Sequence, residues 1–256
     1  DDAYVDHPSF GAPLLGRWLV SHGYRTGIVA QPAWEDPSAV AAMGRPRLFA
    51  GVTAGSLDSM LAHYTAFRKK RSDDAYTPGG RAGSRPNRAS VVYANLVRRA
   101  FPGLPVVLGG IEASLRRASH YDFWSDSLRR SVLFDAKATA VLYGMAEHSL
   151  LALAEELERL EAEGGDVQGV LQAIPGAVYS VRPGELPESA DILELPSHEA
   201  MLADPTLLVE ATRLLERHVH QDRQIAVQAC GDRLAVLNPP GRGLEGADLD
   251  ALYALA

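Results

Sequence analysis

The sequence is short of cysteine, because Cys230 is the only one among its 256 residues. A single thiol cannot form an intrachain disulfide, and it cannot supply the thiolates of a cysteine-rich metal or iron–sulfur site. The apolar run around Cys230 favours a buried side chain over a catalytic nucleophile. The sequence therefore excludes cysteine-based cluster chemistry within this chain, and we predict no metal ligands in it.

Long apolar runs and net positive charge are absent too. No run approaches the roughly 20 residues of a membrane helix, and no secretory signal pattern opens the chain, so we expect a cytoplasmic protein that does not insert into membranes. The formal net charge of −7 argues against a surface built mainly for nucleic acid. Basic residues do cluster, which leaves nucleic acid a possible but not a favoured partner. The clusters are 68–71, the pairs at 98–99, 116–117 and 129–130, and Arg81, Arg85 and Arg88.

Strand-like and helix-like segments alternate through residue 163. Helical periodicity follows residue 11 and continues in 34–43, 57–64, 91–101 and 148–163, and short apolar runs at 24–31, 48–53, 106–108 and 139–143 read as strands. This alternation predicts an α/β fold with a doubly wound parallel sheet over residues 1–169. Residues 1–10 look like a strand-to-helix loop without its strand, so we expect the chain to be a fragment at its start.

The pattern changes after residue 169. Short strands at 177–181 and 190–195, a helix at 206–219, a hairpin of 225–230 with 233–238 and a last helix at 247–255 predict a small α+β extension over residues 170–256. One long segment, 71–89, has no periodicity and offers little apolar surface to bury. We expect it to be a mobile flap or to be ordered by a partner.

The segment that locates the predicted functional face is Val106 to Leu108, followed by Gly109 and Gly110. A β-branched apolar run bounded by Pro105 and two glycines is typical of a buried parallel strand, and the glycines permit a sharp turn or close approach of a ligand. Ligands of open α/β sheets bind at the carboxyl ends of the strands. We therefore predict a ligand-binding face built from Asp6, His7, Thr53, Ser56, Gly109, Gly110 and Glu112.

Two histidines at or near this face leave alternatives open. His7 beside Asp6 suits a general base or a ligand to cobalt or iron, but equally a helix cap. His120 with Asp122 suits an acid–base pair at the rim, although the neighbouring aromatic residues suit packing against the end of the sheet. No Gly-x-Gly-x-x-Gly and no Gly-x-x-x-x-Gly-Lys-Ser/Thr occurs at these loops, so the sequence does not support a nicotinamide or nucleoside-triphosphate site.

Several long strings resemble the N-terminal region of the YgiQ-type radical SAM proteins, and together they cover nearly the whole chain. They are residues 2–11 (DAYVDHPSFG), 51–55 (GVTAG), 71–80 (RSDDAYTPGG), 107–117 (VLGGIEASLRR), 120–126 (HYDFWSD), 135–138 (DAKA), 195–197 (LPS) and 238–240 (NPP).

The resemblance implies a longer enzyme in which this region precedes a radical SAM barrel. That barrel would carry a Cys-x-x-x-Cys-x-x-Cys loop with a [4Fe–4S] cluster and S-adenosylmethionine. This chain has no such loop, so we expect no catalytic residue and no bound cofactor here, and no activity of the fragment alone.

Related N-terminal domains are similar to cobalamin-binding domains, with the pattern Asp-x-His-x-x-Gly. Here Asp6 directly precedes His7, and Gly11 comes four residues later, so the resemblance does not assign cobalamin to this chain. Two hypotheses remain. The fragment is an accessory domain that shapes the substrate or cofactor face of the barrel, or it is a stand-alone binding module for cobalamin or another phosphate-bearing ligand. The substrate is unknown.

Overall fold

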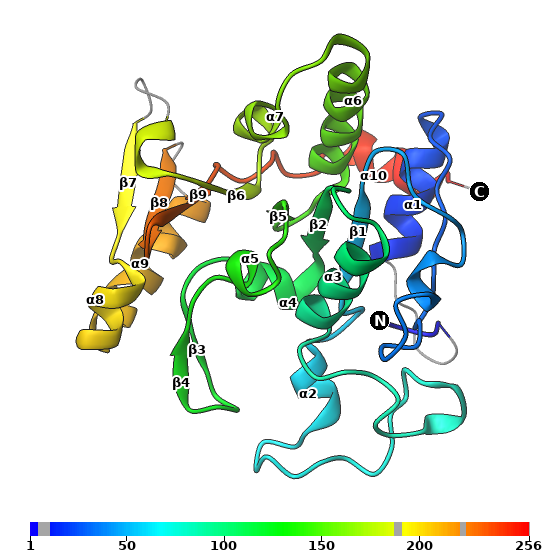
Figure 1. Cartoon of the computed structure of the whole chain (residues 1–256), viewed down its shortest axis with the longest axis horizontal. Coiled ribbons are helices and arrows are strands. Elements are labelled where there is room, and N and C mark those ends of the chain that lie inside the picture. The colour runs from blue at the N-terminus through cyan, green and yellow to red at the C-terminus, as the bar shows by residue number, and fades with distance from the viewer. Residues whose placement is uncertain (5–10, 187–190, 221–223, 256) are drawn as a thin grey trace.

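Short runs rich in valine, leucine and alanine form a seven-stranded sheet in the computed structural model, which describes residues 1–4, 11–186, 191–220 and 224–255. The strands lie in the order β1 (Ala50–Thr53), β2 (Val106–Gly109), β5 (Ala140–Leu142), β6 (Ala177–Val181), β9 (Arg233–Leu237), β8 (Ile225–Cys230) and β7 (Ile192–Leu195). β1, β2 and β5 are parallel, β6, β9 and β8 follow antiparallel to their neighbours, and β7 is parallel to β8 (Figure 1).

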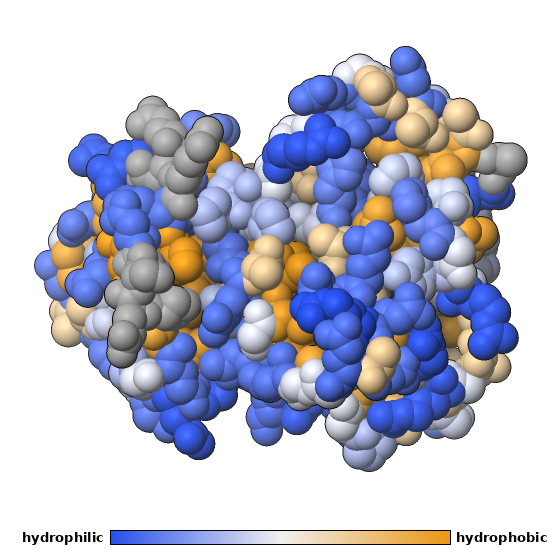
Figure 2. Space-filling view, turned by 90° about the horizontal axis from the view of Figure 1, so that it is seen from above, coloured by the Kyte–Doolittle hydropathy of each residue, from blue (hydrophilic) through white to orange (hydrophobic). Residues whose placement is uncertain are grey.

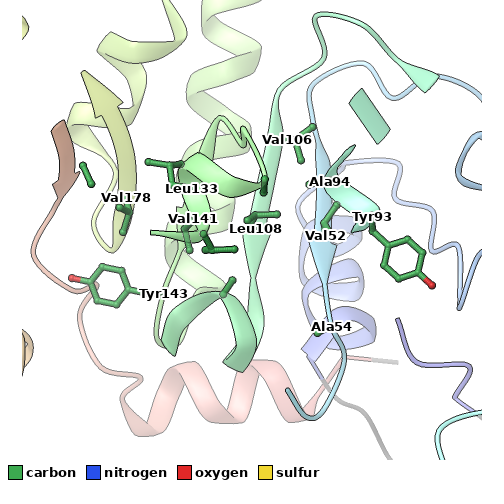
Figure 3. Close-up of a cluster of buried hydrophobic side chains, with 14 of the residues drawn as sticks. Val52, Ala54, Tyr93, Ala94, Val106, Leu108, Leu133, Val141, Tyr143 and Val178 are labelled. Atoms are coloured by element: carbon green, nitrogen blue, oxygen red, sulfur yellow. The ribbon is translucent and has the colours of Figure 1, made fainter. Parts of the chain in front are cut away.

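The register places one row of buried apolar side chains across all seven strands. Its members are Val52, Leu108, Val141, Val178, Leu237, Ala226 and Leu193, each paired with the next. Four of them are labelled in Figure 3, where they lie side by side between the strands and the covering helices. Their strand neighbours, such as Val107 and Leu142, face the opposite core. Both faces are therefore buried, which explains why the central strands are apolar without alternation.

Helices cover both faces of the sheet. The first face packs against α3 (Ala89–Ala100), α4 (Gly110–Leu115), α5 (Val132–Asp135) and α9 (Leu207–His220). The second face packs against α1 (Gly11–Ser21), α6 (Glu147–Glu163) and α7 (Val167–Ala173). Seen from above relative to Figure 1, the outline is indented between the part that carries β7, β8 and α9 and the rest of the molecule (Figure 2).

The remaining elements lie at the ends of the sheet or outside it. The helices are α2 (Ser59–His63), α8 (His198–Ala203) and α10 (Gly246–Tyr253), with 3-10 turns at Ala39–Ala41, Pro78–Gly80 and Pro183–Glu185. A separate hairpin is formed by β3 (His120–Asp122) and β4 (Ser127–Arg129). No helix within the described ranges is long and apolar enough to cross a membrane.

The predicted α/β class is confirmed, and most predicted elements lie where the periodicity placed them. Leu150, Leu153 and Leu157 form the buried stripe of α6, and Gly164, at a positive φ of 78°, ends that helix. β6 pairs with β5, so the same sheet continues past residue 169. The division into residues 1–169 and 170–256 stays a prediction.

Two predictions in the first part of the chain were wrong. Residues 24–31 form no strand, because no neighbouring strand in the described part of the chain supplies ladder hydrogen bonds. Residues 34–43 form only the 3-10 turn Ala39–Ala41. The β3–β4 hairpin and the short helices α5, α7 and α8 were not predicted, since each is too short to show a clear period.

Candidate functional site

The parallel strands β1, β2 and β5 end at the same edge of the sheet, which we call the carboxyl edge (residues 53–58, 109–112 and 143–146). After β2 the chain enters α4, whose Ala113 lies in the first core. After β5 it enters α6, whose leucines lie in the second core. The loops after two neighbouring strands thus diverge to opposite faces, which is the arrangement that opens ligand crevices in α/β sheets.

Gly110 and Thr53 bring the first two loops into contact. Gly110 has a φ of 78°, and a Cβ atom built on it would lie 2.5 Å from Thr53 Oγ1. The same hydroxyl accepts a hydrogen bond from the Gly55 amide at 3.1 Å. Gly109, in contrast, is extended, and its added Cβ would come no closer than 3.8 Å to the Leu142 carbonyl. The prediction that Thr53 and Gly110 lie together is consistent with this geometry, and the close approach requires glycine at 110.

Glu112 connects the starts of two helices. Its side chain is buried, with 1% of the residue exposed, and its two carboxylate oxygens accept hydrogen bonds from the Ser59 amide at 2.8 Å and the Ser90 amide at 2.9 Å. These amides belong to the first turns of α2 and α3, which otherwise lack partners within their helices. The Glu112 carboxylate therefore caps both helices, and its predicted ligand role stays a prediction.

Ser56 lies against Asp2. The Ser56 amide and hydroxyl both donate to one Asp2 carboxylate oxygen, at 3.0 and 3.1 Å. Gly55, at a φ of 94°, permits this approach, because a Cβ there would lie 2.6 Å from the same carboxylate. The loop after β1 is thus fixed to the first residues described.

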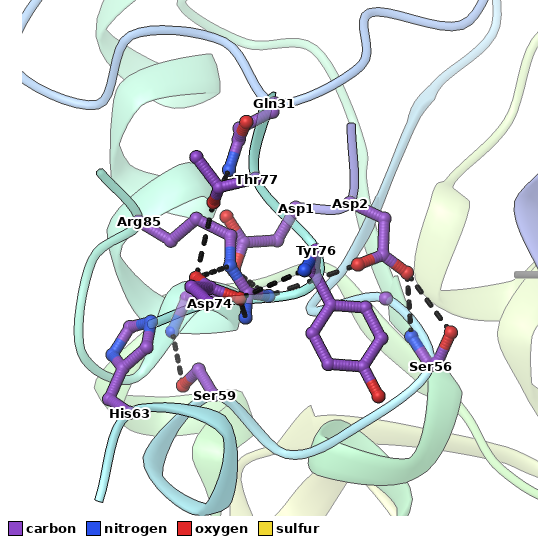
Figure 4. Close-up of polar contacts among 12 residues, drawn as sticks. Asp1, Asp2, Gln31, Ser56, Ser59, His63, Asp74, Tyr76, Thr77 and Arg85 are labelled. Atoms are coloured by element: carbon purple, nitrogen blue, oxygen red, sulfur yellow. Dashed lines mark hydrogen bonds and ion pairs between the residues drawn. The ribbon is translucent and has the colours of Figure 1, made fainter. Parts of the chain in front are cut away.

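A buried ion cluster adjoins this loop, as Figure 4 shows. The Arg85 guanidinium donates two hydrogen bonds to Asp74, at 2.8 and 2.9 Å, and a third to Asp1 at 3.3 Å. Only 1% of the Arg85 side chain is exposed, and Asp2 lies 3.9 Å away. Burial by itself raises the pKa of Asp74, but the hydrogen bonds and charge of Arg85 outweigh it and hold that pKa below its usual value.

Arg85 and Asp74 were not identified from the sequence as a unit. They belong to segment 71–89, which was expected to offer little apolar surface to bury, and which buries the polar side chains Asp74, Thr77 and Arg85. The available signal was the adjacency of the acidic pair 73–74 to an arginine-rich stretch. Charge patterns alone do not distinguish a buried pair from a solvated one.

His120 and Asp122 lie on β3, but each is engaged elsewhere. His120 Nδ1 lies 3.1 Å from the Ala118 carbonyl, and burial lowers the pKa of this imidazole, which favours its neutral form. The Asp122 carboxylate forms an ion pair with Arg88 and accepts hydrogen bonds from Ser125 and from the Trp124 amide. Asp122 thus anchors the hairpin to the residue that precedes α3. Asp6 and His7 lie outside the described residues.

The whole chain, residues 1–256, matches the family model described as "Radical SAM N-terminal". The chain belongs to this family.

Its curated relatives in the family are longer proteins. The chain is 49% identical over 257 residues to UPF0313 protein GSU2873 of Geobacter sulfurreducens and 48% identical over 255 residues to a UPF0313 protein of Thermotoga maritima. Each match covers 99% of this chain but only 41% and 43% of the relative. The resemblance found in the sequence is confirmed, and the chain spans less than half the length of these relatives.

One solved structure shows a distant likeness. It is the radical S-adenosylmethionine methyltransferase TsrM from Kitasatospora setae, with a TM-score of 0.45 and 17% identity, covering 77% of this chain and 32% of that one. At this level of similarity the likeness says nothing about the reaction or cofactor of the present chain.

The family's name implies a cluster and S-adenosylmethionine, and this radical SAM N-terminal domain does not hold the ligands for the cluster. Its one thiol, Cys230, is half-buried on β8, and burial raises its pKa. No group of three or more His, Cys, Asp or Glu side chains in the described ranges is placed to hold a metal ion. A cluster needs three or four thiolates, so the residues of this chain do not fit it.

Proposed function

We propose that this chain is the N-terminal accessory domain of a [4Fe–4S]-dependent radical SAM enzyme, and that it shapes the substrate or cofactor face of the barrel. The observation that carries the proposal is the family match over residues 1–256, together with relatives of which this chain forms about two fifths. The barrel of the same polypeptide is then its main partner, and the substrate is unidentified. A cytoplasmic location agrees with this chemistry.

The single cysteine supports an accessory role over an independent catalytic one. A thiolate set for the cluster must come from outside this chain, since the sequence offers one thiol where at least three are needed. By itself the chain would therefore be inactive. Its contribution would be to bind, orient or enclose what reacts on the barrel.

Cobalamin or another phosphate-bearing ligand is the alternative occupant of the carboxyl edge. A phosphate site would draw on the free amides at the starts of the helices that follow the parallel strands. At α2, the helix after β1, those amides are already bonded to Glu112 and Asp58, which disfavours a phosphate site there. The residues before α4 and α6, Gly109 and Ala146, form no side-chain cap, so a phosphate would have to bind at the start of one of those two helices.

Anaerobic reconstitution of the full-length polypeptide, followed by iron and sulfide analysis and assay of S-adenosylmethionine cleavage, tests the proposal. We expect a cluster and cleavage in the full-length protein and neither in residues 1–256. Stoichiometric iron and sulfide held by residues 1–256 alone would contradict it, and so would a full-length protein that binds no cluster.

A further inference from the structure

Two short helices at the carboxyl edge bury polar side chains and expose apolar ones. α4 buries Glu112 and Ala113 but leaves Ile111 49% and Leu115 61% exposed. In α2, Ser59 and His63 are buried together with Met60 and Ala62, whereas Leu61 is 54% exposed. The two helices therefore leave large apolar side chains in solvent while they bury polar ones, which departs from the usual distribution on a helix.

The two helices that carry these exposed side chains are bound to each other. Glu112 of α4 accepts a hydrogen bond from the Ser59 amide of α2, and Arg116, which follows α4, forms an ion pair with Asp58, the residue that caps α2. The helices are therefore held against each other. We call their exposed apolar residues, with the preceding Leu57, the apolar edge (Leu57, Leu61, Ile111 and Leu115).

Exposed aromatic residues lie on the segment after α2 and on the β3–β4 hairpin. The Tyr64 and Trp124 rings lie 5.3 Å apart, and the Arg68 guanidinium lies 4.7 Å from the Phe123 ring centre. The hairpin tip thus packs on the segment after α2. Phe67 is 88% exposed there and Phe123 43%. Exposed apolar side chains gathered on elements that are bound to one another mark an interaction site more often than scattered exposed residues do.

We propose that the apolar edge is the surface on which the remainder of the same polypeptide, the radical SAM barrel, docks. The proposal rests on the proposed function, and the path of the chain supports it. After β9, the Pro239 carbonyl accepts a hydrogen bond from the Gly176 amide at 2.6 Å, and Asp248 of α10 lies 3.3 Å from His148 at the start of α6. The segment after β9 and helix α10 therefore lie beside the carboxyl end of β5, on the same edge.

The size of the surface favours a tethered partner over a second copy of the chain. Association of two separate molecules costs about 4–15 kcal/mol of translational and rotational freedom, which a patch of a few side chains does not offset. A covalently linked domain acts at a high effective concentration, so a small apolar contact suffices. The relatives are more than twice as long as this chain, which supplies such a domain.

Cysteine labelling of the full-length polypeptide tests this docking. Single Leu61→Cys and Leu115→Cys variants are made in a Cys230→Ser background, and maleimide modification at each position is followed by peptide mass spectrometry. Val209→Cys on α9 and Leu202→Cys on α8 are matched controls, because these residues are 56% and 54% exposed at the other end of the sheet. We expect labelling at positions 61 and 115 to be slower than at the controls by about tenfold or more.

Equal labelling rates at all four positions would overturn the proposal. Protection that disappears on dilution would also overturn it, because it would assign the surface to a second copy. Hydrogen exchange needs no substitution. The peptides covering 57–61 and 111–115 must exchange more slowly in the full-length wild-type polypeptide than in residues 1–256 alone. The proposed function is judged separately by cluster content. A protected edge without a cluster refutes that function alone, and a cluster with an unprotected edge refutes the docking alone.

Discussion

At the scale of single residues, the carboxyl edge is held together by polar groups that bridge elements. Glu112 is the clearest case, since one buried carboxylate supplies the missing acceptors for two helix starts. Placing a charged group inside the protein is tolerated when its hydrogen-bonding capacity is filled. The stability of this edge should therefore depend on such residues as much as on apolar packing.

We expect Glu112→Ala to lower the free energy of unfolding by about 2–4 kcal/mol, because it leaves two buried amides without an acceptor. Glu112→Gln retains one acceptor oxygen and should lose roughly half as much. Glu163→Ala is the control, since Glu163 is exposed at the end of α6 and pairs with exposed Arg159. Urea unfolding measures all three, and a Glu112→Ala protein as stable as wild type would refute the capping role.

Gly110 and Gly109 form a second residue-scale comparison. Gly110→Ala should destabilise the fold by about 1–3 kcal/mol, because a side chain at positive φ is strained and its Cβ would press on Thr53 Oγ1. Gly109→Ala should change stability by less than about 1 kcal/mol, because its backbone is extended and the space is open. Thermal unfolding distinguishes the two, and equal losses would mean that the loop geometry differs from the one described.

At the scale of elements, single ion pairs fix the hairpin to the residue before α3 and hold segment 71–89 in its folded path. Burial by itself raises the pKa of Asp122, but hydrogen bonds from Arg88, Ser125 and the Trp124 amide outweigh this and lower the pKa from 3.8 to about 2. Since the folded-state pKa is depressed, the stabilisation is complete above about pH 4 and is lost as the pH falls toward 2.

Asp122→Asn should therefore be less stable than wild type at neutral pH, by on the order of 1–2 kcal/mol after allowance for the partly exposed Arg88. The difference should shrink as the pH falls from about 4 toward 2. Asp250→Asn on the exposed side of α10 is the control and should follow wild type throughout. Denaturant unfolding at a series of pH values checks this, and a constant difference would show that the carboxylate charge is not involved.

Segment 71–89 depends on Arg85 in the same way. Arg85→Ala should cost about 3–5 kcal/mol and open the segment to proteases, because it leaves the Asp74 carboxylate buried without its partner. Arg85→Lys keeps the positive charge but cannot form two parallel hydrogen bonds to Asp74. Its stability should therefore lie between that of wild type and that of Arg85→Ala. Arg81→Ala is the control, as Arg81 is exposed in the same segment. If wild type is cut within 71–89 as readily as Arg85→Ala, the ion pair does not hold this segment.

At the scale of the whole molecule, one sheet runs through both predicted parts of the chain. The β5–β6 pairing joins residues 140–142 to residues 177–181, and the row from Val52 to Leu193 crosses every strand. Breaking the sheet at residue 169 would expose buried strand edges and apolar side chains on both sides of the break. We therefore expect the described chain to unfold as one unit.

The three tryptophans, Trp18, Trp34 and Trp124, all lie before residue 125, so their fluorescence reports on the first part alone. Far-ultraviolet circular dichroism reports on the helices and strands of the entire chain. In urea the two signals should give the same midpoint and the same dependence of the unfolding free energy on urea concentration, as a single cooperative transition requires. A fluorescence transition separated from the dichroism transition would instead support two domains divided near residue 169.

The sequence by itself determined the α/β class, the family and most of the longer elements. The α6 stripe, the β8–β9 hairpin and the Val106–Leu108 strand were predictable because a period of hydrophobicity or a glycine turn is a local property. The meeting of Thr53 and Gly110 was predictable because parallel strands end at one edge. The single cysteine excluded cluster ligation without any structure.

Only the tertiary structure decided what the polar residues of the edge do. Glu112, Asp74 and Asp122 have ordinary sequence surroundings, and their roles depend on partners 22 and 53, 11, and 34 residues away along the chain. The failed strand at 24–31 and the apolar side chains exposed on α2 and α4 have the same origin. Periodicity records which side chains could share a face, whereas burial and pairing depend on which distant segments arrive there.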